Sequence, residues 1–342
     1  KGDVNRYIKT FEKQFDTKGF VLQTGLNYIA FSLDQRFRKD QNKPRRQYLE
    51  VGYSFNLKII FSPLLKEEEI KKFLGALWCA FYLGNFGSRA RRGFGSIAVK
   101  HFVVKSTEDK EISSNFKLPF SFKPEGEMES WLKENYKKIM ELFSKSIDIE
   151  IYIFKKTDAN TIQSWANEVQ KGREGRYLAK EYKTLSTSPS PFNKLANQNA
   201  WRELLNFMGF TLMAYRSYLK PDYEVAKKII QGQIQGNITI KRVIFGLPLN
   251  FHFSSLKESR RQSGMVFPVK KDEKLRRASP LIYKILKNGD RLDGLIIFIK
   301  GTFLPEDVEL KLESVKIQKP DCSLIEDYLK SLLNRGIIRR LI

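Results

Sequence analysis

Residues 84–96 read Gly-Asn-Phe-Gly-Ser-Arg-Ala-Arg-Arg-Gly-Phe-Gly-Ser, and we call them the Gly/Arg loop. Four glycines and three arginines within thirteen residues let the backbone reach positive φ and supply forked cations that suit phosphate oxygens. Before the loop, apolar residues recur at three- and four-residue steps over 67–83, which predicts a helix. After it, β-branched residues over 97–104 predict a strand.

The order of helix, loop and strand limits the chemistry of this loop. No Gly-Lys-Ser/Thr ends it, and a helix rather than a strand precedes it, so neither a Walker loop nor a dinucleotide fingerprint is indicated. A loop at a helix C-terminus faces the negative end of the dipole, so anion binding there requires the arginines. The alternative is a tight turn whose arginines are solvated. The candidate RNA-binding residues are Gly84, Gly87, Ser88, Arg89, Arg91, Arg92, Gly93, Phe94 and Gly95.

The rest of the chain mixes predicted strands and helices. Apolar residues alternate from Val51 to Phe61, which is typical of a half-buried strand. Asn288 and Gly289 form a good hairpin turn between two later strands. The other predicted elements are helices at 131–143, over much of 161–230 and at 323–334, and strands at 147–154, 238–245, 264–269, 281–286 and 295–300.

This pattern predicts an α+β fold rather than a doubly wound parallel sheet, because the elements are short and lack a regular βαβ order. A length of 342 residues suggests two domains. We place the boundary near residue 157, giving an N-terminal domain over 1–157 and a C-terminal domain over 158–342.

The charge balance indicates an anionic partner. Lys and Arg number 61 against 38 Asp and Glu, a formal net charge of +23, while 42% hydrophobic residues suffice for a folded core. Cys79 and Cys322 have no metal-ligand spacing, so we expect no metal and no cofactor. No apolar run has the length of a membrane span, so a cytoplasmic location without a membrane partner is expected.

Three segments resemble the RAMP superfamily of CRISPR proteins, and more closely the first RAMP subunit of the Cmr-type (type III-B) effector complex. They are the run Ser88–Ser96 within the Gly/Arg loop, Val243–Pro248 and Arg276–Leu281, in the order that this family shows. The resemblance spans about residues 50 to 300, and the first segment is the most specific.

The resemblance implies two ferredoxin-like (RRM-like) domains, the second with a helical insertion. It implies an RNA-binding structural subunit for antiviral defence, with guide RNA near its 3′ end, the paired target RNA and other RAMP subunits as partners. The family pattern also places an opening strand and helix before residue 1, so the first domain looks incomplete.

Further basic residues are candidates for RNA contact. Arg45 and Arg46 lie in a basic connection that could run along RNA. The alternative is that this connection is a solvated loop without a nucleic-acid partner. Arg216 follows Tyr215, a mixture that could stack a base and hold a phosphate, although such tyrosines are often packing residues. The remaining candidates form a second basic cluster, Arg260, Arg261, Arg276 and Arg277.

No catalytic constellation is visible in the sequence. The histidines are His101 and His252, and no triad or metal-ligand spacing surrounds either. Asp16 and Asp34 cannot be matched to the aspartate that RNA-cutting RAMP subunits use. We therefore expect no enzymatic activity. The alternative is a metal-independent endoribonuclease that trims guide RNA with His101 as general base.

Overall fold

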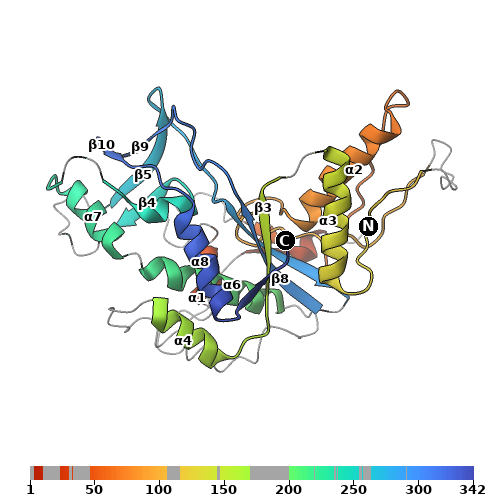
Figure 1. Ribbon diagram of the computed structural model, residues 1–342, viewed down its shortest axis with the longest axis horizontal. Helices are drawn as coiled ribbons and strands as arrows, with labels where there is room; N and C mark the ends of the chain where they lie inside the picture. The colour runs from red at the N-terminus through yellow and green to blue at the C-terminus, as the bar shows by residue number, and fades with distance from the viewer. Residues whose placement is uncertain are drawn as a thin grey trace. The chain divides into compact units, whose positions relative to one another are not determined.

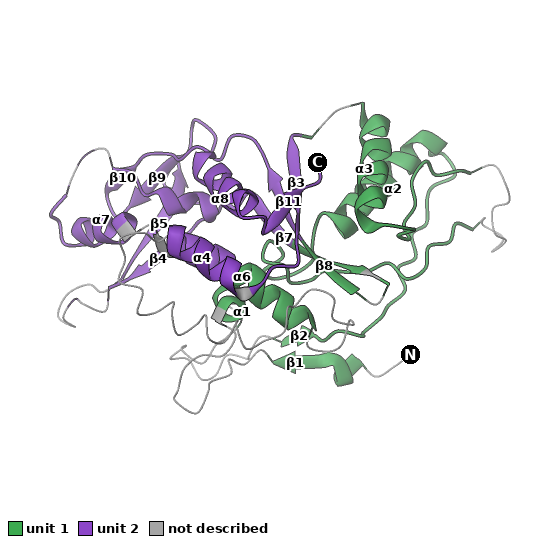
Figure 2. Cartoon of the chain, turned by 60° about the horizontal axis from the view of Figure 1, so that its bottom comes forward, with its two compact units in different colours: residues 1–147, 183–210, 284–294 green, residues 148–182, 211–283, 295–342 purple. Residues whose placement is uncertain are grey.

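The structure is a computed structural model. It describes residues 4–10, 24–30, 33, 47–105, 116–144, 147–169, 200–218, 220–234, 236, 238–253, 256, 263–289 and 291–342. The chain divides into two compact units, shown in Figure 2. Unit 1 comprises Lys1–Ile147, Lys183–Phe210 and Lys284–Gly294, and unit 2 comprises Asp148–Tyr182, Thr211–Tyr283 and Leu295–Ile342.

Unit 1 is organised around two helices, α2 (Glu67–Tyr82) and α3 (Met128–Phe143), which pack side by side (Figure 1). Their contact is aromatic, with the rings of Trp78 and Trp131 5.5 Å apart. Gly75 permits the close approach, since a Cβ there would meet the Ile139 side chain at 3.2 Å. The other elements of unit 1 are η1 (Val4–Tyr7), β1 (Ile8–Thr10), α1 (Thr24–Ile29), β2 (Gln47–Leu49) and the first half of α6 (Ala200–Tyr218).

A first sheet has the order β11-β3-β8-β7. Its strands are β3 (Ile149–Phe154), β7 (Leu281–Asn288), β8 (Arg291–Ile299) and β11 (Ile338–Arg340). Helix α8 (Ser323–Asn334) buries an apolar stripe that includes Leu329. Its Tyr328 hydroxyl lies 2.9 Å from those of Thr211 and Tyr283, which satisfies three buried polar groups at once.

A second sheet in unit 2 has the order β10-β9-β5-β4, with β6 paired to β5. Each of these four strand pairs is antiparallel. Its strands are β4 (Leu249–His252), β5 (Ser263–Lys270), β6 (Glu273–Lys274), β9 (Glu309–Leu312) and β10 (Val315–Ile317). The remaining elements of unit 2 are α4 (Ala159–Val169), α7 (Lys220–Ile230) and η2 (Lys241–Phe245).

The predicted α+β class is confirmed, since helices and antiparallel sheets occur together in the structure. The description as two ferredoxin-like domains stays a prediction. The predicted strand at 238–245 is wrong, because residues 241–245 form the 3-10 helix η2. Over the predicted strand 49–61, the ladder ends at Leu49. The predicted strand at 97–104 has no ladder pairing in the described residues. Alternation sets which side a residue faces, but a ladder also needs a neighbouring backbone.

The division into units also differs from a single boundary near residue 157. The first unit break falls between Ile147 and Asp148, and segments from three parts of the chain interleave. Residues 170–199 of the predicted helical region lie outside the described residues.

Candidate nucleic-acid interface

The Gly/Arg loop begins where α2 ends. The backbone N–H groups of Leu83 and Gly84 both donate to the Cys79 carbonyl, at 2.8 and 3.0 Å, which stops the helix. The loop then turns back on itself, since the Phe86 N–H donates to the Gly95 carbonyl at 3.0 Å. A Cβ on Gly95 would lie 1.7 Å from the Phe86 carbonyl oxygen, so this closure requires glycine.

Two polar side chains fasten the ends of the loop together. The Ser96 hydroxyl donates to Asn85 Oδ1 at 2.6 Å, and Asn85 Nδ2 donates to the Ala90 carbonyl at 2.6 Å. Neither Asn85 nor Ser96 is among the candidates that the sequence predicts. Their positions in the sequence could have identified them, because polar residues at both ends of a glycine-rich loop can hydrogen-bond across it and close it.

The middle of the loop packs against α6. Gly93 is buried with φ +86°, and a Cβ there would lie 2.3 Å from Leu205 Cδ2. Glycine is therefore needed at this position for both its backbone conformation and its lack of a side chain. The loop is a shaped element held to a helix rather than a free connection.

The arginines lie on this shaped backbone. Arg89 adopts φ +63°, uncommon for a residue with a side chain, and its carbonyl accepts the Arg92 N–H at 2.8 Å. Arg89, Arg91 and Arg92 are all half-buried and all have interactions within the chain. The alternative of three merely solvated arginines is therefore disfavoured. Of the other candidates, Gly84 and Phe94 are half-buried, and Gly87, Ser88 and Gly95 are exposed.

In unit 2 the structure brings together the two weaker motif segments. Leu247 and Arg277 form an antiparallel bridge, with N–H to carbonyl distances of 2.7 and 3.2 Å. Arg276 and Arg277 lie beside this bridge and are both exposed. The Arg277 guanidinium lies 5.7 Å from the Phe303 ring. Sequence spacing alone did not predict that these segments pair.

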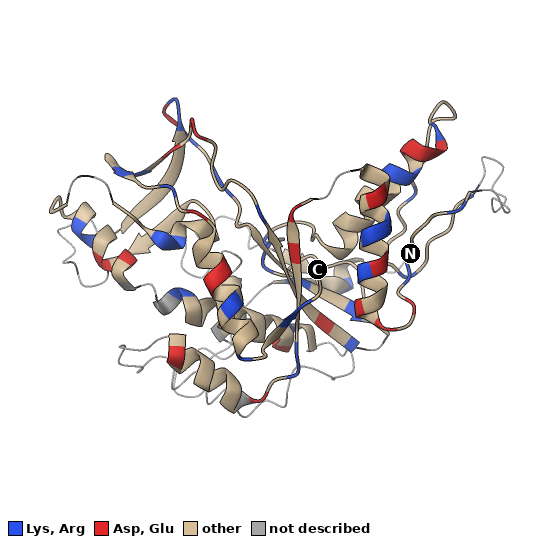
Figure 3. Ribbon diagram, in the orientation of Figure 1, with Lys and Arg blue, Asp and Glu red and all other residues tan. Residues whose placement is uncertain are grey.

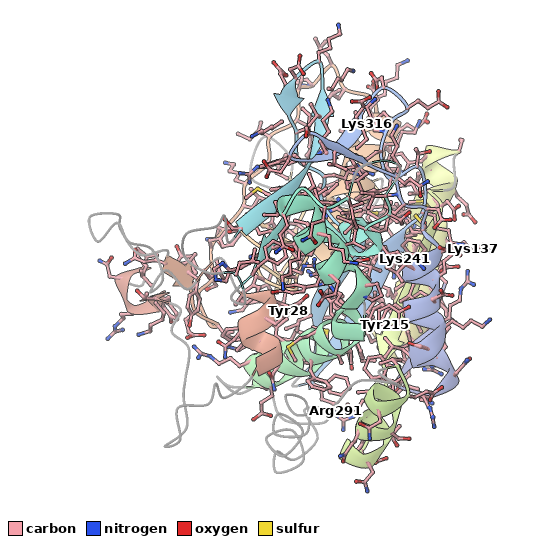
Figure 4. The ribbon with its side chains drawn as sticks, turned by 90° about the vertical axis from the view of Figure 1, so that its left-hand side faces the viewer. Tyr28, Lys137, Tyr215, Lys241, Arg291 and Lys316 are labelled. Carbon is pink, nitrogen blue, oxygen red and sulfur yellow. The ribbon has the colours of Figure 1, made fainter. Side chains whose placement is uncertain are left out.

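Helix α6 carries the remaining described candidate, Arg216. Its guanidinium lies 5.5 Å from the Phe245 ring, within unit 2. The neighbouring Tyr215 is 5% exposed and its ring lies 5.0 Å from that of Tyr328, so it is a packing residue rather than a base-stacking one (Figure 4). Arg45, Arg46, Arg260, Arg261, Asp16 and Asp34 lie outside the described residues.

The excess positive charge is not carried by the exposed faces of α2 and α3. Acidic and basic positions alternate along both helices (Figure 3), and Glu67 and Glu68 pair with Lys71 and Lys72 at 2.5 and 2.6 Å. Such pairs at the i,i+4 spacing neutralise one another locally. A polyanion therefore gains little from these two faces.

The described residues contain no group of His, Cys, Asp and Glu that could hold a metal ion. His101 and His252 are both exposed. Among the helices that the structure describes, none combines the length and apolar character of a membrane span.

No protein-family model matches the chain. The chain is 26% identical over 296 residues to the CRISPR system Cmr subunit Cmr1-1 of Pyrococcus furiosus, a match that covers 86% of this chain and 66% of that protein. The chain thus spans slightly less than two thirds of that relative. The crystal structure of Cmr1 from Pyrococcus furiosus in its apo form matches with 17% identity and a TM-score of 0.35, over 82% of this chain and 61% of that one. The chain is therefore similar in sequence, over most of its length, to a Cmr subunit of a CRISPR system.

Proposed function

We propose that the protein is an RNA-binding structural subunit of a type III-B CRISPR effector complex, and that it contacts guide RNA near its 3′ end and the paired target RNA. The observation that carries the proposal is the Gly/Arg loop. Its backbone is fixed by Asn85 and Ser96, and it carries three arginines within four residues. Fixed forked cations suit sugar-phosphate contacts that do not depend on sequence.

Two further features support the proposal. The net charge of +23 favours a polyanionic partner. The similarity to Cmr1-1, named as a Cmr subunit, favours a place among other RAMP subunits. Because phosphate contacts supply affinity with little discrimination, sequence specificity would come from guide pairing.

We further propose that the protein does not cut RNA. His101, the residue that a metal-independent endoribonuclease would use as general base, is exposed, and no acidic residue is among those that share its cavity in the described structure. Incubation of labelled guide precursor with the wild type and with His101→Ala tests this point. Cleavage that His101→Ala abolishes would establish the enzyme instead.

The RNA contact is tested with the variant Arg89→Ala/Arg91→Ala/Arg92→Ala. The matched control is Lys133→Ala/Lys137→Ala/Lys138→Ala, which removes the same charge from α3. For single-stranded RNA, the slope of log K against log salt should fall by about 0.7 for each phosphate that the protein no longer neutralises. We expect a shallower slope and weaker binding for the loop variant only.

Equal affinity and slope in the loop variant and the wild type would contradict the proposal. So would an equal loss in the α3 control, since net charge alone would then account for binding. Assembly is tested separately by affinity purification from native cells and sequencing of the bound RNA. Recovery of the protein without short repeat-derived RNAs would remove the proposed place in an effector complex.

A further inference from the structure

Unit 1 contains a cavity of about 420 Å³ lined by two segments that are neither helix nor strand, residues 99–104 and 116–123. Both segments lie within the part of the chain that the structure describes. The volume falls in the range of about 300 to 1,000 Å³ that small-molecule sites occupy. The lining residues that carry the argument are Lys100, His101, Phe102, Phe116, Phe122 and Lys123.

One wall of the cavity is fixed by hydrogen bonds to α2 and α3. The Ser121 carbonyl accepts the Trp78 indole N–H at 3.0 Å, and the Ser121 hydroxyl accepts the Trp131 indole N–H at 2.7 Å. Asn135 Oδ1 accepts the Ser121 backbone N–H at 2.6 Å, and Tyr82 donates to the Phe122 carbonyl. Aromatic side chains that also pack between the helices therefore hold this wall in place.

The opposite wall presents an aromatic ring. Phe102 stacks on Phe122 with the ring centroids 4.3 Å apart and the planes 18° apart. Phe122 is 3% exposed, whereas Phe102 is 38% exposed. Phe102 is thus a supported ring with accessible surface, which is the arrangement that a base-stacking platform needs.

The charge of the lining has one sign. Lys100 and Lys123 contribute cations, His101 contributes an imidazole, and none of the described lining residues is Asp or Glu. An aromatic wall favours a planar ring, and ammonium groups in the same lining favour a phosphate. The two together match a nucleotide better than they match an apolar peptide or a cationic ligand.

We propose that this cavity binds one nucleotide of a single-stranded RNA, with its base stacked on Phe102 and a flanking phosphate beside Lys100 and Lys123. The inference rests on the proposed RNA-binding function and adds a second site in unit 1, apart from the residues of the Gly/Arg loop. Stacking accepts any base, so the site fixes a nucleotide without reading its identity.

The test compares Phe102→Ala with Phe55→Ala in the full chain. Phe55 is 56% exposed and is not among the residues that line the cavity, so it controls for loss of an exposed phenylalanine. The probe is a short fluorescein-labelled oligouridylate, measured by fluorescence anisotropy. We expect Phe102→Ala to weaken binding about tenfold, which is about 1.4 kcal/mol, with Phe55→Ala within about twofold of the wild type. Phe102→Trp keeps the stacking surface and should bind as the wild type does.

An abasic oligoribonucleotide separates stacking from charge. It keeps the phosphates, so the wild type and Phe102→Ala should bind it equally. Crosslinking of a 4-thiouridine oligonucleotide to the wild type gives an independent measurement, and its adducts should include residues 99–104 or 116–123.

This site would be overturned if Phe102→Ala bound the oligouridylate as tightly as the wild type, or if crosslinking gave no adducts in either segment. The proposed function would still stand in that case if the Gly/Arg loop variant is impaired in RNA binding. A wild type that binds no RNA would overturn both.

Discussion

The Ser96 hydroxyl accepts a hydrogen bond from the backbone N–H of Ile285 at 3.2 Å. Ser96 ends the Gly/Arg loop and Ile285 lies on β7, so this bond joins residues that are 189 positions apart. The same hydroxyl donates to Asn85 Oδ1. One side chain therefore both closes the loop and fixes it to a strand segment of unit 1, which gives the loop its defined position.

The variant Ser96→Ala tests this double role. It removes the hydroxyl that accepts the Ile285 N–H and donates to Asn85 Oδ1. The free energy of unfolding should therefore fall by roughly 1 to 3 kcal/mol. Chemical denaturation measures the change. The matched control is Ser62→Ala, whose hydroxyl accepts an exposed bond from the Leu64 N–H at 3.3 Å. A Ser96→Ala protein as stable as the control would contradict the role assigned to Ser96.

Helices α1 and α6 cross at two glycines. A side chain added at this crossing should lower the stability of the protein. A Cβ on Gly25 would lie 2.0 Å from the Asn206 carbonyl oxygen, and one on Gly209 would lie 2.2 Å from the Gly25 carbonyl oxygen. The neighbouring Leu26 N–H donates to Asn206 Oδ1 at 3.0 Å, which fixes the crossing. Because the obstacles are backbone atoms, the helices would have to separate.

We therefore expect Gly25→Ala to lower the free energy of unfolding by about 3 kcal/mol or more, the upper end of the range that is typical of overpacking. Gly126→Ala is the comparison, since Gly126 has φ +66° and a Cβ added to it would meet nothing within 4 Å. That variant should cost only about 1 to 2 kcal/mol of backbone strain. Equal thermal shifts for the two variants would argue against the close crossing.

Helices and turns with strong local signals could be predicted from the sequence. The predicted helix at 323–334 has the bounds of α8, because its apolar stripe and polar flanks are local features. The hairpin at Asn288 and Gly289 likewise follows from local turn chemistry. The composition of the Gly/Arg loop is enough to single it out as a candidate anion-binding loop, since glycine and arginine have specific conformational and chemical roles.

Features that depend on distant parts of the chain could not be predicted in this way. The bridge between Leu247 and Arg277 and the packing of Gly93 on Leu205 join residues whose proximity no local pattern encodes. The aromatic cavity at Phe102 is lined by two segments, and neither has a local sequence pattern that would predict a binding site. Alternation at 51–61 indicated an extended segment but not its pairing, because pairing depends on residues elsewhere in the chain.

The Gly/Arg loop contains a matched pair of glycines that separates backbone strain from packing. Gly87 and Gly93 have φ +85° and +86°. Replacement by alanine should therefore introduce similar backbone strain at both positions. A Cβ meets nothing within 4 Å at Gly87, whereas at Gly93 it meets Leu205, which is 1% exposed and cannot easily move.

Gly93→Ala should therefore be less stable than Gly87→Ala by on the order of 1 to 3 kcal/mol, the range for overpacking a filled site. The difference in midpoint between their denaturation curves measures this term directly. If loop shape supports RNA binding, only Gly93→Ala should also weaken oligouridylate binding. Equal stabilities would mean that the loop does not pack on α6 as described.

Lys284 on β7 gives a prediction about pH. Its side chain is fully buried, Nζ has no hydrogen-bond partner among the described residues, and burial lowers the pKa of its ammonium group from 10.5 to about 7. Between these two pH values the unfolded chain binds a proton that the folded chain does not. Stability should therefore rise with pH across that window, by at most about 1.4 kcal/mol per pH unit from this group. Below pH 7 the full penalty of charging the buried amine is present.

Replacement of the buried amine removes that penalty. Lys284→Met keeps a chain of similar length without a charge, so it should be more stable than the wild type at pH 7, with the advantage shrinking as pH approaches 10.5. Urea denaturation of both proteins at several pH values measures the difference. The control is Lys287→Met on the same strand, where the side chain is exposed and no such gain is expected. A gain that does not change with pH, or one shared by Lys287→Met, would mean that hydrophobic burial rather than amine desolvation sets the stability at this position.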